Sequence, residues 1–218
     1  SPDTTELYWR GLVFSALEDG AWRSLNYYDI PASERRPQMA ESVGPSIAYR
    51  VIMETTQQRW LYSLRYAQPH TQGVMSGSDY VLFSPTKLED ERLYSVRSWP
   101  EAALEMDVSP WRREVELRLP GGSNPQTTSF ARELRARSGS DAAFVEAVLA
   151  RFTEEPYDYS INPPLLPVDN PMDSFLFDTR TGFCEHYAAA FVIMMRAAGV
   201  PARVVAGYQG GEVNPVNR

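Results

Sequence analysis

The stretch DTRTGFCEHYAAAFVIMMRAAGVPARVVAGY, residues 178–208, decides how the rest of the sequence is interpreted. It holds the only cysteine of the chain, Cys184, and His186, one of its two histidines. Apolar residues follow Cys184 at intervals of three and four, which predicts a helix with one buried face. Gly182 precedes this helix, Gly199 follows it, and the apolar run after it predicts a strand. We therefore expect a helix, a tight turn and a strand, with Cys184 in the first helical turn.

The position of Cys184 favours a nucleophile. The first turn of a helix has backbone N–H groups without intrahelical partners and carries the positive end of the helix dipole. Both features stabilise a thiolate, and the same N–H groups can donate to an oxyanion during acyl transfer. The alternative is an inert core thiol at the head of an apolar helix face, and the residues by themselves leave both open.

Neither histidine supplies an obvious base for Cys184. Residues two apart on a helix lie about 200° apart around its axis, so His186 faces away from the thiol. The other histidine, His70, falls in a β-rich part of the sequence and would have to reach between domains. The residues by themselves thus offer a candidate nucleophile without a visible base.

Composition places the chain among ordinary globular proteins. Its 218 residues are 43% hydrophobic and 22% charged, which is enough apolar material for a sizeable core. The net charge of -7 disfavours nucleic acid and anionic membranes as partners, since both bind clusters of Lys and Arg. No apolar run approaches the roughly 20 residues of a membrane span. Because the chain opens on SPDTTELYWR, we expect it to be a soluble piece of a larger protein.

The first part of the sequence predicts an antiparallel β-sandwich-like domain over residues 1–122. Apolar and polar residues alternate in several segments, as in strands with one buried face. The clearest are 47–56, 59–67 and 113–120, and weaker ones are 7–14, 80–85 and 92–99. The sequence GGSNP at 121–125 breaks this pattern and marks the expected domain boundary.

Residues 123–218 predict a second domain that begins with helices, so the expected fold class is α+β. Phe144, Val148 and Phe152 recur at helical spacing, and Ser140 is placed to cap that helix; a shorter helix is expected over 130–137. Residues 155–182 hold five prolines and little periodicity. Their aromatic residues and leucines argue against disorder, so we expect a semi-rigid loop that packs on the domain and leads to Cys184.

The motif residues around Cys184 resemble the transglutaminase-like superfamily. The shared pattern is G-x-C-x-x-[YF]-A, an apolar helix, R-x-x-G-[VI]-P-[AV]-R and a strand ending in G-Y. The matching residues are Gly182, Cys184, Tyr187, Ala188, Arg196, Gly199, Val200, Pro201, Ala202, Arg203, Gly207 and Tyr208. With YDYSINPPLL and GYQGGEVNP around it, the pattern is closest to the periplasmic domain of TgpA-type bacterial inner-membrane proteins. The resemblance covers residues 126–218 and, more weakly, the YWRG region near residue 10.

This resemblance implies a papain-like core, incomplete at its C-terminus, with a Cys-His-Asp triad that transfers acyl groups through a thioester. Only Cys184 matches the triad, and the family pattern places the His and the Asp downstream of Arg218. We therefore expect this chain on its own to be inactive. We also expect Val204–Tyr208 to form an open sheet edge, and the chain to bind its own C-terminal remainder.

The resemblance also implies the substrates and the cellular location of the protein. The acyl donor would be a glutamine side chain of a protein or peptide, the acceptor an amine, and the parent protein would be anchored at the periplasmic face of the inner membrane. Two alternatives stay open: a thiol peptidase or amidase acting on periplasmic or cell-wall peptides, and a non-catalytic protein-binding module. A His and then an Asp on successive downstream strands would favour the enzyme.

Two tyrosines before the nucleophile are candidates for the substrate groove or the oxyanion site. These are Tyr157 and Tyr159, and packing is the alternative role for both. The same loop carries Asp158, Asp169, Asp173 and Asp178, but no calcium-binding loop pattern is present. We expect these carboxylates to be solvated and the protein to use neither a metal nor another cofactor.

Overall fold

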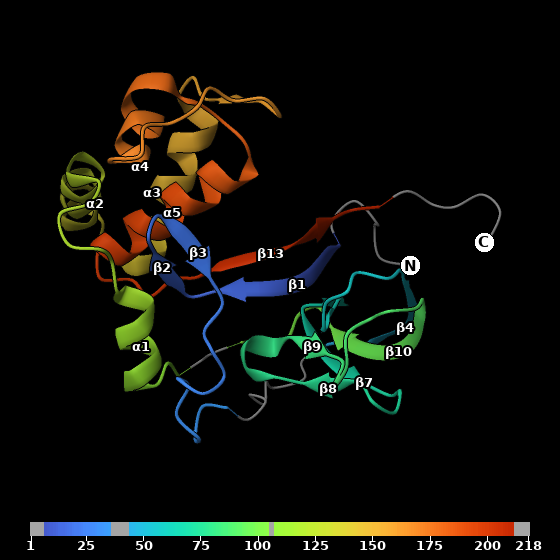
Figure 1. The fold of residues 1–218 in the computed structure, drawn as a ribbon. Helices are drawn as coiled ribbons and strands as arrows, with labels where there is room; N and C mark the ends of the chain where they lie inside the picture. Colours follow the sequence, from blue (N-terminus) through green and yellow to red (C-terminus); the bar gives the residue numbers. More distant parts are fainter. Residues whose placement is uncertain (1–6, 36–43, 105–106, 212–218) are drawn as a thin grey trace. The chain divides into compact units, whose positions relative to one another are not determined.

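The computed structural model describes residues 7–35, 44–104 and 107–211, and the chain packs as two compact units (Figure 1). The β unit comprises 1–14, 24–108 and 205–218, and the helical unit comprises 15–23 and 109–204. The mixture of helices and antiparallel sheets confirms the predicted α+β class. No helix within the described ranges is both long and apolar enough to cross a membrane.

In the part of the β unit that the structure describes, the strands form three small sheets of three strands each. Their strand orders are β13-β1-β6, β4-β10-β7 and β5-β9-β8. The bounds are β1 Tyr8–Phe14, β4 Ile47–Met53, β5 Trp60–Leu61, β6 Ser63–Leu64, β7 Tyr66–Pro69, β8 Met75–Ser76, β9 Leu82–Phe83, β10 Arg92–Trp99 and β13 Val204–Gln209, with a short 3-10 helix at Ser78–Tyr80.

The longest strand pairing in the β unit follows the predicted alternation. Strands β4 and β10 pair antiparallel from Met53 opposite Arg92 to Ile47 opposite Ser98. The inward residues Tyr94 and Val96 are fully buried, whereas Leu93 is exposed on the other face. Period-two patterning therefore predicts these two strands correctly, because one face of their sheet is buried and the other is not.

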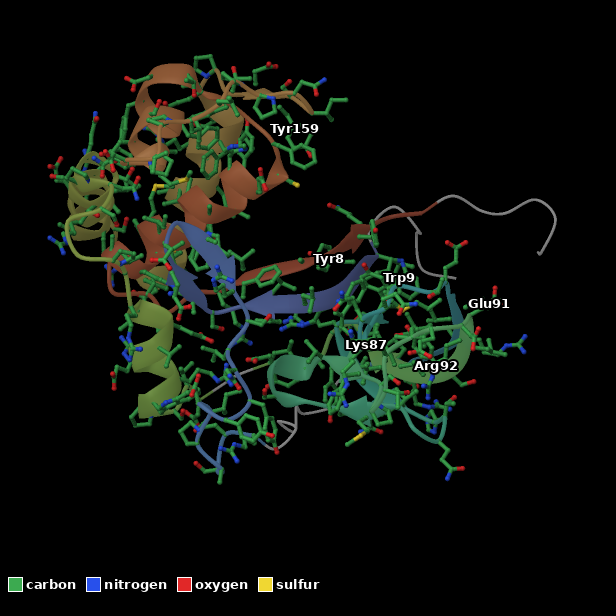
Figure 2. All side chains as sticks on the ribbon, viewed as in Figure 1. Tyr8, Trp9, Lys87, Glu91, Arg92 and Tyr159 are labelled. Carbon is green, nitrogen blue, oxygen red and sulfur yellow. The ribbon has the colours of Figure 1, made fainter. Side chains whose placement is uncertain are left out.

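Strand β13 forms the edge of its sheet among the described strands, as predicted. It lies beside β1, and the Tyr8 hydroxyl donates to the Val205 carbonyl at 2.9 Å. A Cβ atom on Gly207 would collide with the Trp9 carbonyl oxygen, so only glycine allows this approach to β1. Tyr8 and Trp9 are labelled on β1 in Figure 2.

The helical unit contains five α-helices, a π-helix and two small pairs of strands. Its helices are α1 Pro110–Leu117, α2 Pro125–Arg137, α3 Asp141–Glu154, α4 Pro171–Asp173 and α5 Cys184–Ala197, with the π-helix at Ser174–Thr179. Strands β2 (Ala16–Glu18) and β3 (Ala21–Arg23) form a hairpin, and β11 (Asp158–Tyr159) pairs with β12 (Thr181–Gly182). Its core gathers fully buried residues from α2, α3, the π-helix and α5, among them Ala131, Phe144, Val148, Phe175, Leu176 and Met194.

The predicted helices are confirmed, including their end signals. The Ser140 side chain accepts a hydrogen bond from the Ala143 N–H at 3.1 Å at the start of α3. Helix α5 begins at Cys184, and Gly199 adopts a left-handed conformation just after it, with φ of 83°. These helices are predictable because each buries one face against a single core.

The strand predicted at 113–120 is wrong, because these residues belong to helix α1. Ser109 caps this helix by accepting from the Arg112 N–H at 3.2 Å, and Pro110 occupies its first position. Glu116 is buried, although the alternating pattern assigned it to solvent. Its carboxylate pairs with Arg112 at 3.2 Å and with Arg203 at 2.7 Å. The strand prediction assumed that Glu116 faces solvent, whereas these two ion pairs allow it to be buried.

The proline-rich segment 155–182 packs on the helical unit, as expected of a semi-rigid loop. It contains short elements that the sequence did not indicate, namely β11, α4, the π-helix and β12. Phe175 and Leu176 of the π-helix are fully buried in the core. The segment therefore brings its two ends to defined positions beside α5.

Candidate active site

Cys184 is the first residue of helix α5, and its thiol is exposed. This placement excludes the alternative of a buried core thiol. The buried face of α5 is formed by residues further along the helix, among them Ala190, Ile193 and Met194. Cys184 thus heads an apolar helix while it remains accessible to solvent.

The Tyr159 hydroxyl lies beside Cys184. Both the thiol and the backbone N–H of Cys184 lie close enough to affect the pKa of this hydroxyl. Desolvation of the phenol, and then the neighbouring Cys184 sulfur, raise the pKa of Tyr159, although 58% of the residue is exposed. The Tyr159 side chain projects at the surface of the helical unit (Figure 2). Two hydrogen-bonding groups, an N–H and an O–H, are therefore gathered at one sulfur atom.

A pair of short strands and a second tyrosine hold Tyr159 in this position. Strand β11 runs parallel to β12, with Tyr159 opposite Gly182, and the Ser160 N–H donates to the Gly182 carbonyl at 2.9 Å. The Tyr187 hydroxyl donates to the Asp158 carbonyl at 3.0 Å and so ties β11 to α5. The motif tyrosine Tyr187 therefore positions the strand that carries Tyr159.

Gly182 allows the chain to enter helix α5 beneath an aromatic ring. A Cβ atom there would lie 2.5 Å from Cε2 of Phe175 and 3.0 Å from Cβ of His186. The first separation is too short for a real Cβ contact, and the second is tighter than most, so a side chain here would displace the Phe175 ring. The glycine of the motif is therefore explained by the close packing of the π-helix against the residues before Cys184.

His186 caps the helix that begins at Cys184. Its Nδ1 atom accepts a hydrogen bond from the Phe183 N–H at 3.0 Å, as a residue at the third helical position does in a capping box. Its ring also lies against Phe175, with centroids 5.8 Å apart. This role agrees with the prediction that His186 is not the base. His70 belongs to the β unit and follows strand β7.

Tyr157, the other candidate tyrosine, is held in the core of the helical unit. Its hydroxyl donates to the Leu176 carbonyl at 2.9 Å and accepts from Arg151 Nε at 2.9 Å. Burial raises the pKa of Tyr157, and the nearby Arg151 opposes this shift. The Tyr157 hydroxyl thus both donates and accepts within the fold. This arrangement corresponds to the packing role that was the alternative for Tyr157.

The C-terminal end of α5 is fixed by Arg196, whose role the sequence did not indicate. Its guanidinium donates to the carbonyls of Ala202, Arg118 and Ser15 at 2.8, 2.9 and 2.9 Å. It also lies over the Trp22 ring, 5.0 Å from the ring centroid. Burial lowers its pKa to about 10, with Glu116 opposing the shift. One motif residue therefore joins α5 to α1 and to the β2–β3 hairpin.

Asp173 was expected to be solvated, and that expectation is wrong. Its carboxylate accepts from the Gln126 N–H at 3.1 Å, and from the Thr127 N–H and hydroxyl at 2.7 and 2.6 Å. It caps helix α2 from a distant part of the chain, which no local pattern could indicate. Among the residues that the structure describes, no group of three or more His, Cys, Asp or Glu could hold a metal ion.

Comparisons with known proteins match both parts of the chain. The model of the TgpA N-terminal domain matches residues 1–105, and that of the transglutaminase-like superfamily matches residues 128–217. A protein-glutamine gamma-glutamyltransferase of Pseudomonas aeruginosa is 40% identical over 214 residues, which are 98% of this chain and 31% of that protein. The uncharacterized protein YebA of Bacillus subtilis is 36% identical over 98 residues, 44% of this chain and 13% of that protein.

Two crystal structures are similar over nearly the whole chain. Both are of the periplasmic domain of TgpA from Pseudomonas aeruginosa, and both are 39% identical to this chain. The one bound to ethylmercury gives a TM-score of 0.91 with 99% of this chain and 75% of that chain covered; the other gives 0.88 with 99% and 73%. The chain therefore belongs to the transglutaminase-like superfamily, and within it to the TgpA-type proteins.

Proposed function

We propose that Cys184 is the nucleophile of a transglutaminase-type acyl transfer. The observation that carries this proposal is the exposed thiol at the start of α5, with its own N–H and the Tyr159 hydroxyl beside it. Support comes from the P. aeruginosa relative, whose name describes this activity; this chain spans 31% of its length.

In the first half of the proposed reaction, the Cys184 thiolate attacks the carboxamide carbon of a glutamine side chain. A C–S bond forms, and the carbonyl electron pair moves to oxygen. The resulting oxyanion lies between the Cys184 N–H and the Tyr159 O–H and accepts a hydrogen bond from each. Collapse breaks the C–N bond, ammonia leaves with a proton from the catalytic acid, and a thioester remains.

In the second half, a primary amine attacks the thioester carbon. Its proton passes to the catalytic base, the same two donors hold the second oxyanion, and the Cys184 thiolate leaves as the amide forms. Water in place of the amine would give hydrolysis. The exposed position of Cys184 supports access for a protein-borne amine.

The catalytic base and its orienting carboxylate are proposed to be a His and an Asp that follow residue 218 in a longer protein. His186 supports this assignment, because its Nδ1 already accepts the Phe183 N–H. We further propose that the longer protein is membrane-anchored on the periplasmic side and modifies glutamine residues of proteins. The 218-residue chain by itself is then inactive and binds its C-terminal continuation along the open edge of β13.

Incorporation of a fluorescent primary amine into a glutamine-containing protein tests this function. We expect the longer protein to incorporate it, Cys184→Ala to abolish incorporation, and the 218-residue chain to show none. The chain contains one lysine, Lys87, so Lys87→Arg removes this chain's own lysine as an acceptor that competes with the fluorescent amine. Cys184-dependent ammonia release without amine incorporation would identify an amidase instead. Incorporation that persists in Cys184→Ala would refute the proposal.

A further inference from the structure

An apolar loop lies next to the candidate active site. Residues Ser160–Asn170, here called the apolar loop, directly follow Tyr159. Leu165 is 99% exposed, Val168 98% and Ile161 76%. Burial of apolar side chains of this size is favourable, so three of them exposed to water in one short loop indicate a surface that another molecule covers.

The apolar loop is anchored at both ends. At its start, the Ser160 N–H donates to the Gly182 carbonyl at 2.9 Å. At its end, the Asn170 side chain accepts from the Asn124 N–H at 2.7 Å, and the Asn124 side chain accepts from the Met172 N–H at 2.8 Å. Three prolines between these anchors, Pro163, Pro164 and Pro167, restrict the backbone further. The exposed side chains therefore project from a backbone with restricted conformational freedom.

The first anchor places the loop beside the nucleophile. Tyr159, the residue before the loop, pairs with Gly182 in the β11–β12 ladder, and its hydroxyl lies beside Cys184. Gly182, whose carbonyl accepts from Ser160, lies two residues before Cys184. A polypeptide whose reactive side chain reaches Cys184 would thus have its neighbouring residues within reach of the apolar loop.

The acidic residues around the apolar loop favour a basic binding partner. From residue 154 to residue 185 the sequence has one basic residue, Arg180, which pairs with Glu155 at 3.4 Å. Five acidic residues in this range are exposed, namely Glu154, Asp158, Asp169, Asp178 and Glu185. An anionic lipid surface would be repelled by these carboxylates, and so would a second copy of this chain, whose net charge is -7. A basic partner would be attracted.

We propose that the apolar loop binds the acyl-donor polypeptide, which carries apolar and basic residues near its reactive glutamine. The apolar residues cover Ile161, Leu165 and Val168, and the basic residues face the acidic side chains around them. This inference rests on the function proposed above. It names the donor as a cationic, partly apolar segment of a protein.

The test compares loop variants of the longer protein. Leu165→Ser with Val168→Ser removes the apolar contacts, and Leu149→Ser, at a half-exposed leucine of α3, is the matched control. The substrates are glutamine peptides flanked by Leu and Arg, by Leu and Glu, or by Ser alone. For the Leu/Arg peptide we expect KM to rise about tenfold or more in the double variant, with kcat retained. Leu149→Ser should leave KM within about twofold.

Binding measured without turnover separates this inference from the proposed function. Fluorescent peptides titrated into Cys184→Ala should bind in the order Leu/Arg, Ser, Leu/Glu, with a preference that weakens in high salt. Asp169→Asn should reduce both the affinity for the Leu/Arg peptide and its salt dependence. Equal alkylation rates of Cys184 in the double variant and the wild type would show that the nucleophile is intact.

Three outcomes would overturn the inference while leaving the acyl transfer standing. The first is a double variant that turns over and binds the Leu/Arg peptide as the wild type does. The second is a wild type that makes no distinction among the three peptides. The third is loop-dependent sedimentation with phosphatidylglycerol vesicles but no loop dependence with peptides, which would assign the loop to a membrane. Absence of any amine incorporation by the wild type would instead refute the proposed function.

Discussion

The two ends of helix α5 differ in exposure and in what their motif residues do. At the N-terminal end, Cys184 is exposed and has the Tyr159 hydroxyl as its neighbour. At the C-terminal end, Arg196 is 4% exposed and donates to three backbone carbonyls from three other segments. One helix thus joins an end with an exposed thiol to a buried structural end.

This difference shows how a thiol can be held in place without being buried. The buried end supplies the packing and the hydrogen bonds that fix the helix, so the exposed end can keep donors available for a substrate. Removing a group from the buried end should therefore affect stability, whereas removing one from the exposed end should affect chemistry. Three substitutions test this division.

Arg196→Met should give the largest effect, and it should act on stability. The substitution leaves up to three carbonyls without their donor, one of them in a buried bond and two in partly buried bonds, and loss of a buried bond costs about 1–3 kcal/mol. We expect the free energy of unfolding of the helical unit to fall by about 3 kcal/mol or more. Urea denaturation followed by circular dichroism at the helical minimum measures this loss.

Arg137→Met serves as the control for Arg196→Met. Arg137 lies in the last turn of α2, where its side chain is exposed and donates to the carbonyl of Glu133 in its own helix. It should change the free energy of unfolding by less than about 0.5 kcal/mol. Equal losses for the two variants would contradict the structural role of the buried end of α5.

Tyr159→Phe should come next, and it should act on chemistry. Loss of one oxyanion donor lowers kcat by about 10²–10³-fold in comparable sites. Since 58% of Tyr159 is exposed, we expect little change in the free energy of unfolding. Tyr157→Phe is the matched control, because its hydroxyl bonds to Leu176 and Arg151 within the fold. It should lower stability by about 1 kcal/mol and leave kcat nearly unchanged.

The pH dependence of kcat gives a second readout for Tyr159. Desolvation and the Cys184 sulfur raise the pKa of Tyr159, so its hydroxyl stays protonated above the usual titration range of tyrosine. Activity that depends on this donor should fall only when the pH exceeds that raised value. Tyr159→Phe should lack this alkaline fall. If kcat of Tyr159→Phe falls at the same alkaline pH as kcat of the wild type, the fall is due to another group.

Sequence patterns predicted the helices of the core and the long strands better than the connections between them. Helices α3 and α5 each bury one face, so their spacing and end signals agree with the structure. Helix α1 was misread because Glu116 is buried by pairing with two arginines, one of which lies 87 residues away. Polarity patterns assume that charged residues face water, and that assumption fails wherever a distant partner neutralises them.

The candidate site was predictable at one residue and no further. Cys184 was identified from its place at the start of a helix, which is local information. The roles of Tyr157 and Tyr159 were not separable in sequence, because both are tyrosines two residues apart in the same loop. Tyr157 donates to the Leu176 carbonyl of the π-helix, whereas strand β11 brings Tyr159 to Cys184, so tertiary contacts give the two tyrosines different surroundings.

His186→Ala should give the smallest effect and completes the comparison, since this residue lies at the exposed end of α5 yet serves structure. Loss of the bond between its Nδ1 and the Phe183 N–H should lower the free energy of unfolding by about 1 kcal/mol. His186→Gln should retain most of that stability, because glutamine at this position can accept the same N–H. Both variants should keep amine incorporation within about tenfold of the wild type, since loss of a catalytic base costs about 10²–10⁴-fold. A fall of that larger size in His186→Gln, with stability retained, would make His186 the base and remove the need for a downstream histidine.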